Sequence, residues 1–364
     1  MKNITVGIPA YKAQKHIVDC LASIQIQSIR KDIAIIIASD YPDDDYSFVK
    51  DKFPDLDITI MPCKENTGAG LARQRALDAC KTEWITFIDS DDVFFNPMAI
   101  EMLQGGIQQN TIEVQGVFLQ EVEKNPSGIR LAPRNDVGHP WVFGRLYNVK
   151  FLKENDIKFS ELRAMEDGEF NWKIRMTIEG SPFNINMVNE AVYLWRIGSE
   201  HSITRTGVGK DGIPQYNYDL CQIGATIASI RAAKFCKHRN PFNGAIDRFI
   251  TEMMVGQYFT YVECLAKKPV FAKQNLFNAK RFYHECYKDI ENRISDKILT
   301  DIYTMQRGQK SQDLLGIIPE ISFFDFMNRV KKEKYEGEEE LKRIRAKLPK
   351  KVIENDLKTG VATF

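Results

Sequence analysis

Residues 83–97, EWITFIDSDDVFFNP, join a short apolar run to a group of carboxylates. Residues 84–88 are all aromatic or β-branched, a composition typical of a buried strand. Asp89, Asp91 and Asp92 follow at once, and their mutual repulsion is usually relieved by a hard cation such as Mn²⁺ or Mg²⁺. Ligands bind at strand ends in open α/β sheets. The stretch therefore predicts a metal-binding turn after a core strand, with a solvated Asp-rich turn as the alternative.

Strand and helix signals alternate from the N-terminus to this turn. Strands are expected at residues 4–8, 33–38, 56–61 and 84–88. Helices are expected between them at residues 16–28, 46–52 and 71–77. Such alternation predicts an α/β fold with a largely parallel sheet and right-handed crossovers. The carboxyl ends of its strands then meet at one rim.

Gly68 and Gly70 precede the helix expected at residues 71–77. Backbone N–H groups at such a helix start can hold a phosphate, although neither a dinucleotide-binding fingerprint nor a P-loop is present. Arg73 and Arg75 lie just inside the helix, and an arginine there favours an anion such as a diphosphate. For at least one of the two, a solvated helix face is the alternative.

Taken together, these motifs resemble the nucleotide-sugar half of family 2 glycosyltransferases with the GT-A fold. The matching segments are residues 8–11 (IPAY), residues 66–73 (NTGAGLAR) and the D-x-D motif within residues 89–92 (DSDD). The resemblance covers roughly residues 3–206. It implies a GT-A-type, mostly parallel nucleotide-sugar-binding sheet flanked by helices.

The resemblance also implies which residues bind the donor and a metal. Nucleotide-sugar-binding residues would be Pro9, Ala10, Tyr11, Asp40, Asn66, Gly68, Arg73, Asp89, Ser90 and Arg196. The residues after Ser39 differ from the family pattern of a paired acid followed by glycine and serine. Asp91, with Asp89 and His201, would hold Mn²⁺ or Mg²⁺ on the diphosphate, and Asp92 would be a further ligand or would support one.

Two further segments of the matching region concern the acceptor. Glu166 and Asp167 open an amphipathic helix, where they would also serve as an ordinary capped N-terminus. Transfer of a sugar to a hydroxyl needs a carboxylate that takes the proton of that hydroxyl. The family uses the Glu-Asp pair for this step, so the resemblance implies that Asp167 is the base and that Glu166 orients the acceptor or the base. Trp141 would stack on a ring of the acceptor, and core packing is its alternative. Residues 193–204 resemble the family's closing segment, an aromatic strand followed by a flexible loop that would fold over the diphosphate.

The composition is that of an ordinary globular protein, with 43% hydrophobic residues in 364. Its seven cysteines form no C-x-x-C and are expected to be reduced thiols without zinc. No secretory signal and no apolar run near ~18 residues is visible, so a cytoplasmic protein is expected. Peripheral membrane contact stays open.

We expect a glycosyltransferase domain at residues 1–206, with a donor half at 1–97 and an acceptor half at 98–206, and a mainly helical region at 207–364. Residues 1–204 carry 22 basic and 29 acidic side chains, and residues 205–364 carry 28 and 20, so their net charges are −7 and +8. A basic region suggests an anionic partner, with a solvated surface as the alternative. Lys280, Arg281 and Lys288 are the candidate contacts, and Phe323, Phe324 and Phe326 would otherwise make a dimer contact.

The predicted function is that of an inverting, metal-dependent hexosyl- or pentosyltransferase. It would move a sugar from a nucleotide-sugar donor to a hydroxyl of a glycan or lipid-linked glycan. One alternative acceptor is a polyanion such as phage DNA with hydroxylated bases, which would have to leave the helix stack. A non-catalytic nucleotide-sugar-binding module is the other alternative.

Overall fold

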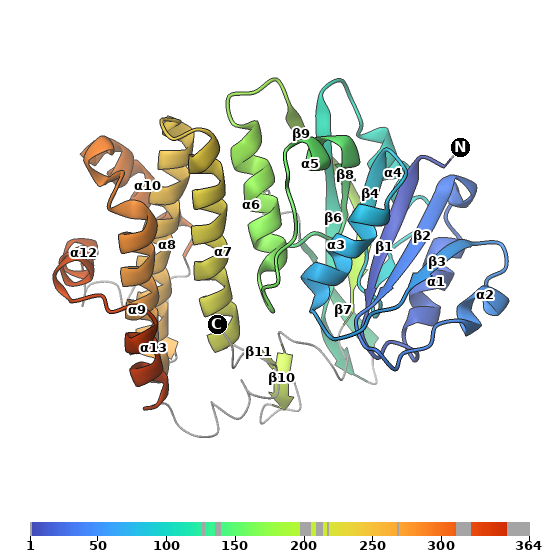
Figure 1. Cartoon of the computed structure of the whole chain (residues 1–364), viewed down its shortest axis with the longest axis horizontal. Helices are drawn as coiled ribbons and strands as arrows, with labels where there is room; N and C mark the ends of the chain where they lie inside the picture. The colour runs from blue at the N-terminus through green and yellow to red at the C-terminus, as the bar shows by residue number, and fades with distance from the viewer. Residues whose placement is uncertain are drawn as a thin grey trace. The chain divides into compact units, whose positions relative to one another are not determined.

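The computed structural model describes residues 2–125, 128–134, 140–196, 205–208, 214–216, 218–267, 269–310 and 322–347. The chain divides into two compact units, Met1–Ser202 and Ile203–Phe364 (Figure 1). No helix of the described part of the chain is both long and apolar enough to cross a membrane.

Four parallel strands form the first half of the sheet in unit 1. They are β1 (Ile4–Ala10), β2 (Ile33–Ser39), β3 (Asp57–Met61) and β4 (Trp84–Phe87). Their order is β3-β2-β1-β4, with β1 hydrogen-bonded on both sides. Every residue of β1 is buried, as expected when helices cover both faces of a sheet. The predicted parallel α/β half is confirmed.

The second half of the sheet is mixed. It contains β5 (Val93–Phe94), β6 (Thr111–Asn125), β7 (Gly128–Arg134), β8 (Arg145–Asn148) and β9 (Asn184–Trp195). The sheet continues from β4 in the order β8-β6-β9-β5, and β7 pairs with β6. Strand β8 runs antiparallel to both of its neighbours, whereas β6 and β9 are parallel.

The described part of unit 1 contains six α-helices. They are α1 (Ile17–Gln25), α2 (Phe48–Lys52), α3 (Ala69–Ala79), α4 (Ala99–Gly105), α5 (Val149–Glu154) and α6 (Glu166–Ile178). Alternate residues of a strand face opposite sides of its sheet. On β2, Ile35 and Ile37 join the core that includes α1, whereas Ile36 packs with Ala72 and Ala76 of α3. Helices α1 and α3 therefore cover opposite faces.

Unit 2 is mainly helical. Its helices are α7 (Tyr218–Arg239), α8 (Gly244–Lys267), α9 (Ala272–Phe282), α10 (Asp296–Gly308), α12 (Phe323–Lys332) and α13 (Glu338–Arg345). A short ribbon pairs β10 (Arg205–Val208) with β11 (Pro214–Tyr216). Helix α9 ends in a π-helical turn, Tyr283–Tyr287, and the 3₁₀ turn Glu291–Arg293 follows.

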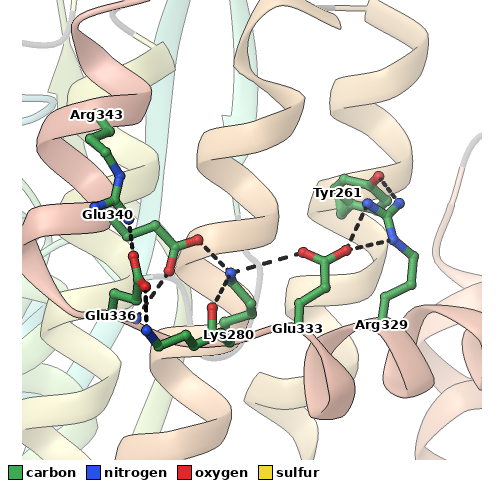
Figure 2. A network of polar contacts seen from close by, with 8 residues as sticks. Tyr261, Lys280, Arg329, Glu333, Glu336, Glu340 and Arg343 are labelled. Atoms are coloured by element: carbon green, nitrogen blue, oxygen red, sulfur yellow. Dashed lines mark hydrogen bonds and ion pairs between the residues drawn. The ribbon is translucent and has the colours of Figure 1, made fainter.

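The basic residues expected to contact a polyanion are mostly engaged within unit 2. Lys280 is only 3% exposed, and its Nζ donates to the Lys334 carbonyl oxygen at 2.9 Å. Figure 2 shows its ammonium group between the carboxylates of Glu333 and Glu340. Arg281 forms ion pairs with two further glutamates, Glu285 and Glu338, and only Lys288 is exposed. The expectation that Lys280 faces an anionic partner is wrong, because this buried ammonium group pairs with carboxylates of its own unit.

The three phenylalanines expected at a dimer contact also differ from one another. Phe326 is fully buried. The ring of Phe323 meets that of Tyr258 edge-on, with centroids 5.3 Å apart. Only Phe324 is exposed, at 73%. Two of the three therefore belong to the core of unit 2.

Candidate functional site

The acidic turn after β4 is held from the opposite part of the sheet. Asp92 is buried, and its Oδ2 accepts a hydrogen bond of 2.5 Å from the Tyr193 hydroxyl. Its Oδ1 accepts one of 2.7 Å from the backbone N–H of Arg196. The N–H of Asp89 donates to the same Tyr193 hydroxyl at 3.3 Å. Burial, then the charges of Asp91 and Asp89, raises the pKa of Asp92.

Arg73 of α3 connects this turn to the start of α6. Its Nη2 lies 2.6 Å from Asp89 Oδ1, and its Nη1 lies 2.7 Å from Glu166 Oε1. Arg73 is only 4% exposed, and its ion pair with Glu166 is largely shielded from water, whereas Asp89 is partly hydrated. A single buried guanidinium therefore brings together the two acidic motifs that the sequence places 77 residues apart, at Asp89 and Glu166.

The contact between α3 and α6 requires Gly70. A Cβ at this position would lie 2.5 Å from the Ser160 carbonyl oxygen and 2.7 Å from Glu166 Cγ. No real Cβ approaches other atoms so closely, so only glycine permits this packing. Gly68 begins the same helix with φ +91°, a conformation that also favours glycine. These glycines thus serve the close approach of two helix starts.

Asp167 lies at the first turn of α6, next to Glu166. It follows Met165, whose φ of 67° lies in the left-handed region that non-glycine residues rarely adopt. Desolvation, and then the charge of Glu166, raises the pKa of Asp167 to about 8, while Arg73 acts in the opposite direction. A carboxyl with a raised pKa beside a strained backbone position is a good candidate for proton transfer.

Asp40 and Asn66 lie in one loop network beside this pair. Asp40 Oδ1 accepts hydrogen bonds from the N–H and hydroxyl of Thr67 at 2.8 and 3.0 Å, and its Oδ2 accepts one from the Gly68 N–H at 2.8 Å. Arg163 donates to the side chain of Asn66 and, at 3.1 Å, to its carbonyl oxygen. Asp40 therefore shapes the loop that precedes α3, and its contact with a nucleoside stays a prediction.

The neighbouring arginine of α3 has a structural role. Arg75 donates to the Ser39 carbonyl oxygen and, at 3.0 Å, to Thr67 Oγ1. It therefore ties the end of β2 to the loop before α3. Of the two arginines considered for an anion, only Arg73 reaches the acidic turn.

The ends of β1 and β2 carry an exposed aromatic pair. Tyr11 is 37% exposed, and its ring meets that of Tyr41 edge-on with centroids 5.6 Å apart. Lys12 Nζ lies 4.4 Å from the Tyr41 centroid. Pro9 and Ala10, just before Tyr11, are buried. Tyr11 is thus the accessible member of the predicted Pro9–Tyr11 donor contacts.

Trp141 belongs to an aromatic cluster. Its ring stacks on that of Phe143, with centroids 6.0 Å apart. The ring centroids of Phe118 and Trp195 lie 5.5 and 5.7 Å from its own. Trp141 is half-buried and packs against the main core. This arrangement favours core packing, and an additional acceptor contact stays a prediction.

Three predicted positions remain, Arg196 just after β9, Ser90 and His201. Arg196 Nη1 forms an ion pair of 3.0 Å with Asp19 on α1. Ser90 is buried within the acidic turn. His201 lies outside the described residues. The sequence predicts Tyr193 only as part of an aromatic strand, and no local pattern indicates that its hydroxyl joins Asp89 and Asp92.

A comparison with known protein families finds a match within unit 1. Residues 5–165 match the family model described as glycosyl transferase family 2. The poly(ribitol-phosphate) beta-N-acetylglucosaminyltransferase TarS of Staphylococcus aureus is 25% identical over 188 residues, which are 48% of this chain and 32% of that protein. Glycosyltransferase GlyA of Streptococcus pneumoniae is 33% identical over 219 residues, 53% of this chain and 30% of that protein. The aligned part thus spans about a third of these relatives.

Solved structures match over more of the chain. A crystal structure of S. aureus TarS 1–349 in complex with UDP has a TM-score of 0.57 at 15% identity, covering 86% of this chain and 93% of that one. A second TarS crystal structure has a TM-score of 0.58 at 16% identity, covering 82% and 50%. At these identities the likeness concerns the fold. Together with the family match, it confirms the predicted GT-A-type fold: residues 5–165 of this chain match glycosyl transferase family 2.

Proposed function

We propose that the chain transfers a glycosyl group, with inversion, from a nucleotide sugar to a hydroxyl of a teichoic-acid-type or related glycan polymer. The observation that carries this proposal is the Arg73 bridge. It holds the turn of Asp89, where the donor's diphosphate is expected, beside Glu166 and the candidate base Asp167. A site for direct displacement needs this proximity of donor and base.

In this proposal Asp167 takes the proton of the attacking hydroxyl. Its raised pKa makes it a stronger base once it is ionised, and this suits proton abstraction near neutral pH. Glu166 is held in the Arg73 ion pair, so it orients the site and keeps a second negative charge next to Asp167. A non-catalytic binding module would have no use for this pair.

The donor set of the acidic turn fits a divalent cation. Asp89 and Asp91 are half-buried carboxylates on one short turn, and hard oxygen ligands suit Mn²⁺ or Mg²⁺. Asp92 is engaged by Tyr193 and Arg196, so we assign it to shaping the turn. Among the described residues, no three acidic, His or Cys side chains form a complete metal cluster, so substrate or water oxygens would supply the other ligands. When bound, the cation would offset the charge of the leaving diphosphate.

The acceptor class is supported by the relatives. TarS is named as acting on poly(ribitol-phosphate), and so is a beta-glucosyltransferase of Bacillus spizizenii that is 25% identical over 213 residues. We therefore place a polyol-phosphate or related surface polymer ahead of other acceptors. Nucleic acid is not retained, because the basic residues that suggested it include a buried ion pair at Lys280.

The test is Asp167→Asn, assayed for transfer from UDP-sugars to poly(ribitol phosphate) and for UDP binding by calorimetry. We expect turnover to fall by a factor of about 10² or more with UDP affinity within about twofold of wild type. Asp156→Asn is the matched control: it removes an exposed carboxylate that forms an ion pair with Lys158, and it should change neither quantity. Loss of UDP affinity in step with turnover would contradict the assignment of Asp167 as the base.

A further inference from the structure

Arg163 takes no part in the proposed transfer step, yet it lies close to the acidic start of α6. It is half-buried and precedes Glu166 by three residues. Its guanidinium packs over Gly68 before α3, where a Cβ would lie 3.4 Å from Arg163 Nη1. Within the part of the chain that the structure describes, Arg163 forms no ion pair with a carboxylate, and both of its hydrogen bonds go to Asn66. Among these residues, Asn66 is therefore the partner through which Arg163 can act.

The two hydrogen bonds fix the side chain of Asn66 in one orientation. Arg163 Nη1 donates to Asn66 Oδ1, and its Nη2 donates to the main-chain carbonyl oxygen of Asn66 at 3.1 Å. A guanidinium has only N–H donors, so it can face the oxygen of an amide and not the NH₂ group. No described residue accepts a hydrogen bond from Asn66 Nδ2. Arg163 therefore makes the Asn66 side chain a hydrogen-bond donor toward a ligand.

The segments that carry the two side chains are themselves held in place. The loop before α3 is fixed by Asp40, which accepts a hydrogen bond of 2.8 Å from the Gly68 N–H. The segment before α6 is fixed by Ser160, whose hydroxyl donates to the buried Glu169 at 2.7 Å. The orientation of the Asn66 amide is thus set before a ligand arrives, so binding would not have to order it.

The position of Asn66 along the rim of the sheet indicates which part of a nucleotide it would meet. The strands follow the order β3-β2-β1-β4 (Figure 1), with Asn66 in the loop after β3 and Asp89 in the turn after β4. Neighbouring strands are about 4.8 Å apart, so the two ends of this row are separated by roughly 14 Å. The exposed Tyr11 follows β1, between them. With the diphosphate at Asp89, the nucleobase is the part that extends toward Tyr11 and Asn66.

We propose that Arg163 is a positioning residue for nucleobase selection: it turns the Asn66 amide so that Nδ2 donates to a ring carbonyl oxygen, the O4 of uracil. This inference rests on the proposed function, because it takes the diphosphate of a nucleotide sugar to bind at Asp89. Cytosine carries an amino group in place of this carbonyl, so two donors would face each other. Both would then lack an acceptor, and a site built around a hydrogen bond rejects such a ligand strongly.

The experiment measures the affinities of UDP and CDP for the full chain by calorimetry, without an acceptor. We expect UDP to bind the wild type about tenfold or more tightly than CDP. Arg163→Met removes both donors and lets the Asn66 amide rotate, so this ratio should fall to about threefold or less. Arg163→Lys keeps a donor for Asn66 Oδ1 and should restore most of the ratio. The matched control is Lys64→Met, which removes an exposed cation from the same loop and should leave the ratio unchanged.

A second variant tests the donor itself. Asn66→Asp replaces the NH₂ group by an oxygen, so it should weaken UDP binding more than CDP binding. Equal affinities of the wild type for UDP and CDP would overturn the proposal, and so would an equal loss of both affinities in Arg163→Met or in Asn66→Asp. An equal loss in Arg163→Met would mean that Arg163 serves only the stability of the loop or the charge of the diphosphate. Absence of transfer with an intact UDP/CDP ratio would contradict the proposed transferase alone.

Discussion

Replacement of Arg73 by glutamine tests whether the buried bridge organises the site. Arg73→Gln leaves Glu166, whose side chain is 10% exposed, without its cation, and it frees the better hydrated Asp89, at 33%. Removing one partner of a buried ion pair usually costs about 3–5 kcal/mol. Because solvent already screens Asp89, we expect a loss near the lower end, about 3 kcal/mol, in urea unfolding at neutral pH.

The same change should shift the pH dependence of activity. The pKa of Asp167 in the folded protein, about 8, lies above its ordinary value of 3.8, and Arg73 lowers it. Without Arg73 this pKa rises further. The rise of kcat/KM with pH, which reports ionised Asp167, should therefore move to higher pH. Stability should depend on pH through the same group. Because the folded state holds this proton up to about pH 8, the contribution of Asp167 to the free energy of unfolding decreases as the pH rises from 3.8 to about 8. In the variant this decrease should extend to higher pH.

Arg75→Gln is the matched control on the same helix. Arg75 donates to a carbonyl and a hydroxyl oxygen and, among the described residues, forms no ion pair with a carboxylate. It should lose about 1–2 kcal/mol and keep the wild-type pH midpoint. If Arg73→Gln lost under about 1 kcal/mol, or if its midpoint stayed at the wild-type pH, the bridge would not be the organising contact inferred from the structure.

Three other changes have clear expectations. Asp91→Asn should abolish the enhancement of UDP binding by Mn²⁺ in calorimetry, and full transfer in excess chelator would show that no metal is required. Gly70→Ala should lower the free energy of unfolding by about 1–3 kcal/mol and weaken UDP binding, because its Cβ would collide with Ser160 and Glu166. Gly105→Ala should be tolerated, because a Cβ there meets no atom within 4 Å, and equal stability of the two variants would refute the close approach at Gly70. Lys280→Met should destabilise unit 2 by about 3 kcal/mol and leave UDP affinity unchanged. Lys288→Met, at an exposed site, should not change stability, and similar effects of the two variants would contradict the pairing of Lys280 in Figure 2.

Several features of this protein are determined by local sequence. The apolar runs of β1, β2 and β4 predict the parallel half of the sheet because a strand covered on both faces must be apolar throughout. Polar residues at the strand ends predict the rim with the acidic turn. The family match to residues 5–165 rests on these same short motifs, whose order and spacing survive at low overall identity.

Other features depend on which distant segments meet. Strand β8 enters the sheet beside β4, and the Tyr193 hydroxyl reaches Asp92 across 101 residues. Arg73 reads locally as a helix-start anion ligand, yet its guanidinium lies between Asp89 and Glu166. Lys280 likewise reads as a surface cation and is buried against Glu340. Periodicity records which face of an element is covered, but the partner of a charged side chain is decided by packing, because only packing sets which opposite charge is close enough to compensate its desolvation.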